Sequence, residues 1–165
     1  MQQDYGQFLE LIQPQPGYKM LDITSHADAL TRAVAQRLSE FEGSRLAIAL
    51  YPGEHEEFTA SKSLKIHSPK DYSAPFKALP RDNDVVMIRD VLSRHAYPER
   101  IVKAIYTTLA NAGDIIIVNR AGSMDIQEQL ELLEACEFRA GNSIDILDGY
   151  ELVMGKKMHM WGNGL

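Results

Sequence analysis

The chain has 165 residues, of which 45% are hydrophobic and 24% are charged. This is the composition of one ordinary globular domain, and it excludes a largely disordered, collagen-like or low-complexity chain. A net charge of -6 argues against nucleic acid or an anionic membrane as the main partner, because phosphate groups attract basic surfaces.

The cysteine content and the first residues indicate which cellular compartment and which partners to expect. The single cysteine, Cys136, cannot form an internal disulfide, and no cysteine or histidine cluster has metal-site spacing. Met1–Tyr5 lacks the pattern of a leader, and no apolar run approaches the ~20 residues of a membrane span. We therefore expect a soluble, cytoplasmic protein with no metal site and no nucleic-acid or membrane partner.

The first half of the chain predicts strands that alternate with helices. Apolar residues at helical spacing favour a helix over Tyr5–Ile12, which the following prolines and glycine end. The next expected elements are a strand over Tyr18–Thr24, a helix over Ala27–Phe41, a strand over Arg45–Tyr51 and a weaker strand over Ser63–His67. Residues 68–84 hold three prolines and little periodicity, which predicts a loop.

The second half carries stronger signals. The expected elements are a strand over Val85–Ile88, a helix over Pro98–Asn111, a strand over Asp114–Asn119, a helix from Ser123 or Asp125 to about Glu137, and strands over Asn142–Leu147 and Tyr150–Lys156. Asp148 and Gly149 predict a tight hairpin turn between the last two strands.

This alternation indicates an α/β domain with a largely parallel sheet that helices cover on both faces. Ligands bind such sheets at the carboxyl ends of the strands. We expect a single domain made of an N-terminal helix and loop (1–17), a core (18–157) and a tail (158–165).

One segment resembles the class I S-adenosylmethionine-dependent methyltransferase family. Leu79–Val118 begins LPRDNDVVMIRDVLSRH and is similar to the fourth strand of that family, the following helix and the turn into strand five. The later LLEACEF and the closing hairpin are similar to its last helix and its antiparallel strands. The resemblance implies a Rossmann-like three-layer sandwich with a mostly parallel seven-stranded sheet that ends in an antiparallel hairpin. It also implies S-adenosylmethionine as the cofactor.

The cofactor motif of the family is degenerate in this chain. The first loop of the family reads acid-x-Gly-x-Gly-x-Gly, and matching its acid to Asp22 places Thr24, His26 and Asp28 where the glycines belong. Glycine lets that backbone turn tightly and approach the cofactor without a Cβ. The substitutions add bulk and, at Asp28, negative charge. We therefore expect the fold without the standard cofactor site.

The other family acids are also displaced. The carboxylate that would accept hydrogen bonds from ribose falls at Leu50 or Tyr51, and Glu54 lies a few residues late. The acid beside adenine is missing, with Asp71 displaced from its position. Asp90, after the fourth strand of the resemblance, is the best-matched polar residue. Each lost charge-assisted hydrogen bond weakens binding by roughly 1.5–3 kcal/mol.

Two interpretations compete for the polar residues after the first strand. As an active site, this segment would use His26 as a general base. As a helix start, Thr24 or Ser25 would cap the helix and Asp28 would lie in its first turn. We favour the helix start, with a solvated His26.

Other polar clusters have similar structural interpretations. Glu54–Glu57 cannot converge on one ion and predicts a solvated acidic first turn of a helix. Asp90 could bind an amine and His95 could act as a base, but we favour a network of arginine–aspartate ion pairs that braces this loop. Cys136 is expected to be a small core residue, because carboxylates rather than a base flank it.

Three functions remain open. The first is a degenerate, non-catalytic methyltransferase-like domain that binds another protein or a small molecule and takes no S-adenosylmethionine. The second is an active methyltransferase whose altered cofactor site is drawn from Asp22, Thr24, His26, Tyr51 and Asp90. The third, a nucleotide-binding module, lacks its Gly-x-Gly-x-x-Gly motif. The terminal strands and Met158, Met160 and Trp161 are the expected surface for a protein partner or self-association.

Overall fold

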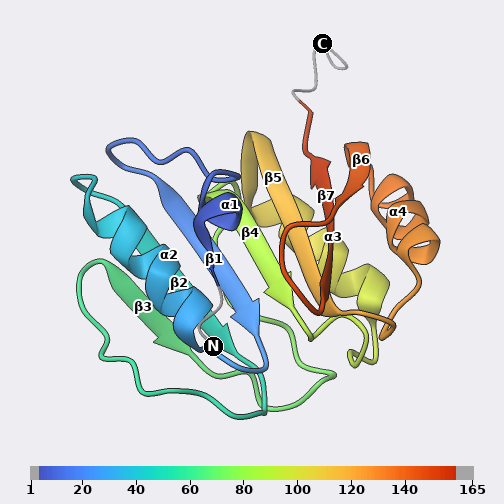
Figure 1. The fold of residues 1–165 in the computed structure, drawn as a ribbon, viewed down its shortest axis with the longest axis horizontal. Coiled ribbons are helices and arrows are strands. Elements are labelled where there is room, and N and C mark those ends of the chain that lie inside the picture. The colour runs from blue at the N-terminus through green and yellow to red at the C-terminus, as the bar shows by residue number, and fades with distance from the viewer. Residues whose placement is uncertain (1–3, 159–165) are drawn as a thin grey trace.

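Seven strands form one sheet in the computed structural model, which describes residues 4–158 (Figure 1). The strands are β1 (Lys19–Thr24), β2 (Arg45–Leu50), β3 (Leu64–His67), β4 (Asn83–Arg89), β5 (Leu109–Arg120), β6 (Arg139–Ile144) and β7 (Tyr150–Lys156). The helices are α1 (Gly6–Leu9), α2 (Ala29–Ser39), α3 (Pro98–Thr108) and α4 (Ile126–Ala135). Within residues 4–158, no helix is long and apolar enough to cross a membrane.

The sheet has the order β3-β2-β1-β4-β5-β7-β6. The first five strands of that order run parallel, and β7 pairs antiparallel with both β5 and β6. The chain crosses from the β3 side to the β4 side of β1, so the strand order reverses beside β1. This confirms the predicted mostly parallel, seven-stranded sheet with an antiparallel end.

Helices cover both faces of the sheet and make three layers. Successive side chains of a strand point to opposite faces, so Met20 and Leu21 on β1 enter different apolar clusters. Met20 lies in the cluster that includes Leu30 and Val34 of α2. Leu21 lies in the cluster that includes Ile105 of α3. Asp22, next along β1, therefore faces α2.

The bounds of several helices differ from the sequence prediction, and two of these differences have a direct structural cause. Helix α2 begins at Ala29 rather than Ala27, because the carboxylate of Asp28 accepts the amide of Leu30 and caps the helix there. Helix α3 ends at Thr108 rather than Asn111. The next residues continue directly as β5, since Leu109 is buried and pairs with β4.

The connection between the last strands is also longer than predicted. Strand β6 occupies Arg139–Ile144, so residues 145–149 join it to β7. Asp148 and Gly149 therefore do not form a two-residue turn, although Gly149 has the positive φ that a turn requires. Leu147 is buried in the cluster on the α2 face, and this burial draws the segment out of the sheet.

Candidate functional site

The carboxyl ends of β1, β2 and β4 lie side by side. Thr24 pairs with Leu50 on one side and with Arg89 on the other, so the loops after these strands meet at one edge of the sheet. This is the edge where parallel α/β sheets bind ligands. The candidate residues Asp22, Thr24, Tyr51 and Asp90 are therefore brought to one edge, as their positions in the sequence predict.

Arg89 is the central charged residue of this edge. Its guanidinium Nη1 donates to Asp28 Oδ1 at 2.9 Å, and Nη2 donates to Thr31 Oγ1 at 2.7 Å. Nη2 also lies 3.6 Å from Asp22 Oδ2, to which the Thr31 hydroxyl donates at 2.8 Å. Only 2% of Arg89 and none of Asp22 is exposed. The four side chains form the Arg89 network, which joins β1 and β4 to the start of α2.

The neighbouring carboxylates keep the guanidinium of Arg89 charged. Burial works against the charge, but Asp22 and Asp28 outweigh it and raise the pKa of the Arg89 guanidinium. Burial of Asp22 raises the pKa of its carboxyl, opposed by Arg89 and by the Thr31 hydroxyl. Removing one partner of such a buried pair leaves an uncompensated charge and costs about 3–5 kcal/mol.

A second cluster gathers around His26. Its Nε2 lies 3.4 Å from Asp90 Oδ2 and 3.4 Å from the hydroxyl of Tyr150 on β7. Asp90 Oδ1 accepts the amide of Arg120 at 2.9 Å. Burial and the nearby Arg89 charge lower the pKa of His26, which favours a neutral imidazole.

Sequence reasoning missed Tyr150 and Arg120 at this cluster. The two residues are far apart in the chain, but they pair directly across β5 and β7. The antiparallel register of these strands is the signal that places them together. His26 was expected to be solvated, yet its side chain is only 16% exposed.

The loops after β1 and β2 are closed against each other. The amide of Tyr51 donates to the Thr24 carbonyl at 2.9 Å, and the amide of Glu56 donates to the Ala27 carbonyl at 2.8 Å. A Cβ added to Gly53 would lie 1.8 Å from the Ser25 carbonyl oxygen, so the two backbones are in direct contact. These contacts occupy the gap between the two strand ends.

Several sequence interpretations of these loops are wrong. Thr24 and Ser25 do not cap α2; Thr24 Oγ1 instead accepts the amide of His26 at 3.0 Å. Glu54–Glu57 is not the first turn of a helix but part of an irregular loop. His55 in this loop accepts the amide of Ala27 at its Nδ1.

Of the remaining sequence interpretations, some are confirmed and others are not. Arginine–aspartate pairs do brace this edge: Arg89 pairs with Asp22 and Asp28, and Asp90, just beyond β4, lies 3.9 Å from Arg120 Nε. The Tyr51 ring lies on the α3 side and its hydroxyl donates to the Ala74 carbonyl, so it does not join the Arg89 network. Cys136 is a buried core residue, as predicted, and burial raises the pKa of its thiol.

These residues do not fit the cofactor that the sequence resemblance implies. Asp22 and Thr24 have no exposed surface, and the Asp22 carboxylate already serves Arg89 and Thr31. The backbone of Ser25 is in direct contact with Gly53. Asp22 is thus enclosed and presents no surface to a ligand.

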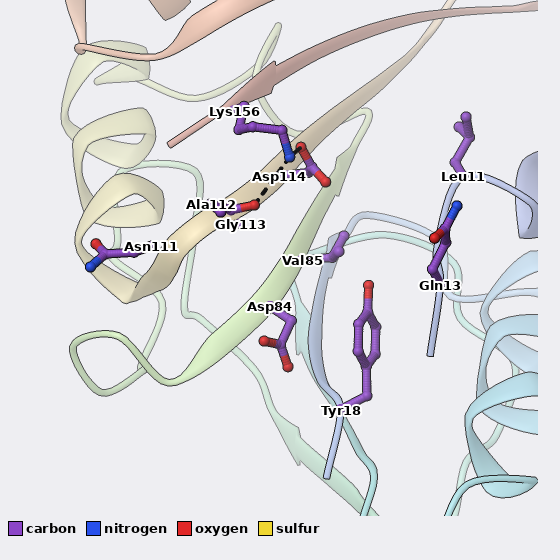
Figure 2. Close-up of a pocket in the computed structure, with 10 residues that line it drawn as sticks. All are labelled: Leu11, Gln13, Tyr18, Asp84, Val85, Asn111, Ala112, Gly113, Asp114 and Lys156. Carbon is purple, nitrogen blue, oxygen red and sulfur yellow. Dashed lines mark hydrogen bonds and ion pairs between the residues drawn. The ribbon is translucent and has the colours of Figure 1, made fainter. Parts of the chain in front are cut away.

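A cavity of about 380 Å³ opens at the opposite edge of the sheet (Figure 2). Asp84 and Asp114 line it beside Tyr18, whose pKa burial raises to about 12. Lys156 Nζ lies 2.9 Å from Asp114 Oδ1, and Asp84 accepts the amide of Lys19 at 2.8 Å. Asp114 is therefore paired with a cation, whereas Asp84 is held by a backbone amide.

The sheet order and the antiparallel β7 define the class I S-adenosylmethionine-dependent methyltransferase fold. The chain superposes on a SAM-dependent methyltransferase from Aquifex aeolicus with a TM-score of 0.73 and 9% identity, covering 94% of this chain and 90% of that one. It is similar to a chain solved in complex with the Haloferax volcanii Trm112 methyltransferase activator, with a TM-score of 0.70, 14% identity and coverage of 93% and 88%.

Human N-acetylserotonin methyltransferase, solved with SAM, gives a TM-score of 0.63 at 16% identity, with 86% of this chain and 48% of that chain covered. The described fold therefore corresponds to about half of that longer enzyme. No family model matches the chain, and no curated protein matches it in sequence. The similarity is thus one of fold.

Proposed function

We propose that the chain is a non-catalytic methyltransferase-fold domain that acts as a binding or interaction domain. The observation that carries this proposal is the Arg89 network. It uses Asp22, the residue that matches the first acid of the family motif in the sequence resemblance, as an internal ion-pair partner. A buried guanidinium now holds together the strand ends and the start of α2. The carboxylate stabilises the fold instead of meeting a ligand.

Admitting the cofactor would also break existing interactions. Opening the Arg89 network would remove the pairing of Arg89 with Asp22 and Asp28.

Thermal unfolding with S-adenosylmethionine or S-adenosylhomocysteine tests the proposal. At about 100 times its Kd, a ligand stabilises the folded state by about 2.7 kcal/mol, which is about 5–10 °C for a domain of this size. We expect no shift in Tm with either compound, whereas an active methyltransferase in the same assay shifts. A reproducible shift of this chain would overturn the proposal.

An active methyltransferase with an altered site is the second candidate. Three buried atoms at this edge make no hydrogen bond within residues 4–158: Asp22 Oδ1, Arg89 Nε and Asp90 Oδ2. Such atoms usually have partners, so they favour a polar ligand or water at the edge. In the same thermal assay, this candidate requires a shift that His26→Gln removes and His67→Gln retains, since His67 lies on β3, away from this cluster.

The terminal strands stay the expected surface for a protein partner. Strand β6 is the edge of the sheet and is largely exposed, and Met158 beyond β7 is 45% exposed. Met160 and Trp161 lie outside the described residues. The similar chain solved with the Trm112 activator supports protein partnering as a role for this fold.

A further inference from the structure

A small cavity with an aromatic wall lies on the α3 side of the carboxyl edge. Its volume is about 160 Å³. Its lining includes Phe76, His95, Tyr97, Arg100, Ile101 and Ala104. A cavity of ~150 Å³ is large enough to hold one benzene ring. The space therefore fits a single six-membered ring.

The wall of this cavity belongs to a longer row of rings. The ring centroid of Tyr51 lies 5.6 Å from that of Tyr72 and 5.8 Å from that of His95. The His95 ring lies 6.3 Å from Tyr97 at an interplanar angle of 65°. His95 is fixed in this row, because its Nδ1 accepts the amide of Tyr97 at 2.9 Å. The cavity thus presents ring edges and faces held in place by hydrogen bonds.

A guanidinium is stacked at each end of the row. Arg94 lies 4.4 Å above the centroid of Tyr72, and Arg100 lies 4.6 Å above that of Tyr97. Within residues 4–158, neither arginine has a carboxylate within ion-pair distance, in contrast to Arg89. Stacking fixes these two cations without neutralising them.

Two carboxylates lie near these cations. Glu99, in the first turn of α3, lies 3.3 Å from Lys103 Nζ, and Asp71 accepts the amide and the hydroxyl of Ser73. Among residues 4–158 neither carboxylate is within ion-pair distance of Arg94 or Arg100. The two guanidinium groups therefore stay available to an anion at the mouth of the cavity.

From this geometry we propose that the cavity binds a small aromatic carboxylate. The ring enters between Phe76, Ile101 and Ala104, and the carboxylate meets the guanidinium of Arg100. This binding site deepens the proposed role as a binding domain by naming a class of ligand. It does not require S-adenosylmethionine, so the two tests can fail separately.

Titration of the full chain with benzoate, followed by the methyl resonances of Ile101 and Ala104, tests the site. We expect saturable shifts with a Kd on the order of 1 mM, as suits so small a ligand. Acetate lacks the ring and benzylamine reverses the charge, so each should bind at least about tenfold more weakly. No saturable shift at these methyl groups, or equal binding of benzylamine, would overturn the proposal.

Three variants sharpen the titration. Arg100→Gln removes the exposed cation and should weaken benzoate binding about tenfold. Arg139→Gln on β6 removes another exposed arginine, away from the cavity, and should leave the Kd unchanged. Ala104→Leu fills the cavity and should abolish binding, while an otherwise intact spectrum shows that the chain is folded. Unchanged affinity in Arg100→Gln contradicts the assigned role of its guanidinium.

Discussion

At the scale of single residues, Arg89 links the chemistry of the edge to its stability. Asp22 has no exposed surface, and its charge is acceptable there because Arg89 and the Thr31 hydroxyl lie against it. A buried ion pair contributes little net stability when complete, but its loss is costly when one partner is removed. Removing Arg89 is therefore expected to cost more stability than its ion pairs contribute to the intact protein.

Replacing Arg89 with methionine should lower the free energy of unfolding by about 3–5 kcal/mol, because Asp22 and Asp28 then lose their cation. Urea unfolding measures the loss. The double variant Arg89→Met with Asp22→Leu should recover part of it, since no buried carboxylate then remains beside α2. Additive losses in the double variant would contradict a direct interaction between the two side chains.

Part of this site could be predicted from the sequence. The resemblance brought Asp22, His26 and Asp90 to one edge, and the structure places them there. The sequence also predicted arginine–aspartate ion pairs here, but it did not identify Asp22 and Asp28 as the partners of Arg89. Asp22 shares the face of Arg89 because β1 and β4 are adjacent and parallel, which only the sheet order specifies.

At the scale of elements, the loops after β1 and β2 replace a glycine-rich turn. Gly53 is the residue that permits their contact, since an added Cβ would lie 1.8 Å from the Ser25 carbonyl oxygen. This position was not foreseen from the sequence. A glycine after Pro52 indicates a turn, but the closeness of a second loop depends on how both strands end.

The Gly53→Ala variant should lower the free energy of unfolding by about 1–3 kcal/mol, because the loops must separate. The amide resonances of Ala27 and Tyr51, which mark the contact between the loops, should shift as well. Gly122→Ala provides a matched control. Its Cβ meets open space, so the only cost is that of holding alanine at a positive φ. Unchanged resonances of Ala27 and Tyr51 in Gly53→Ala would show that the loops do not touch as described.

The boundaries of elements were harder to predict than their order. Periodicity extended α3 to Asn111, whereas pairing of Leu109 with Asn83 of β4 draws the chain into β5 three residues earlier. Leu147 was assigned to the end of a strand before the expected Asp148–Gly149 turn, yet it is buried against the α2 face outside the sheet. In both cases a tertiary contact decides the boundary, and local pattern does not contain it.

At the scale of the whole molecule, stability should be highest in the centre of the sheet. Strands β1 and β4 have neighbours on both sides, and their side chains are buried on both faces. Strand β6 lies at the edge, is largely exposed and has a shifted register against β7. Local opening is cheapest where few contacts must break, so amide exchange should rise from the centre to this edge.

Amide hydrogen exchange of the intact chain measures this gradient. Amides within β1 and β4 should exchange at least about 100-fold more slowly than those of β6. The amides of Tyr51 and Glu56 should be protected with the central strands, because each donates across the closed loops at the candidate site. If those two amides exchange as fast as β6 does, the loops open readily in solution. The edge would then be accessible to a cofactor without global unfolding, which is the outcome that the Arg89 network argues against.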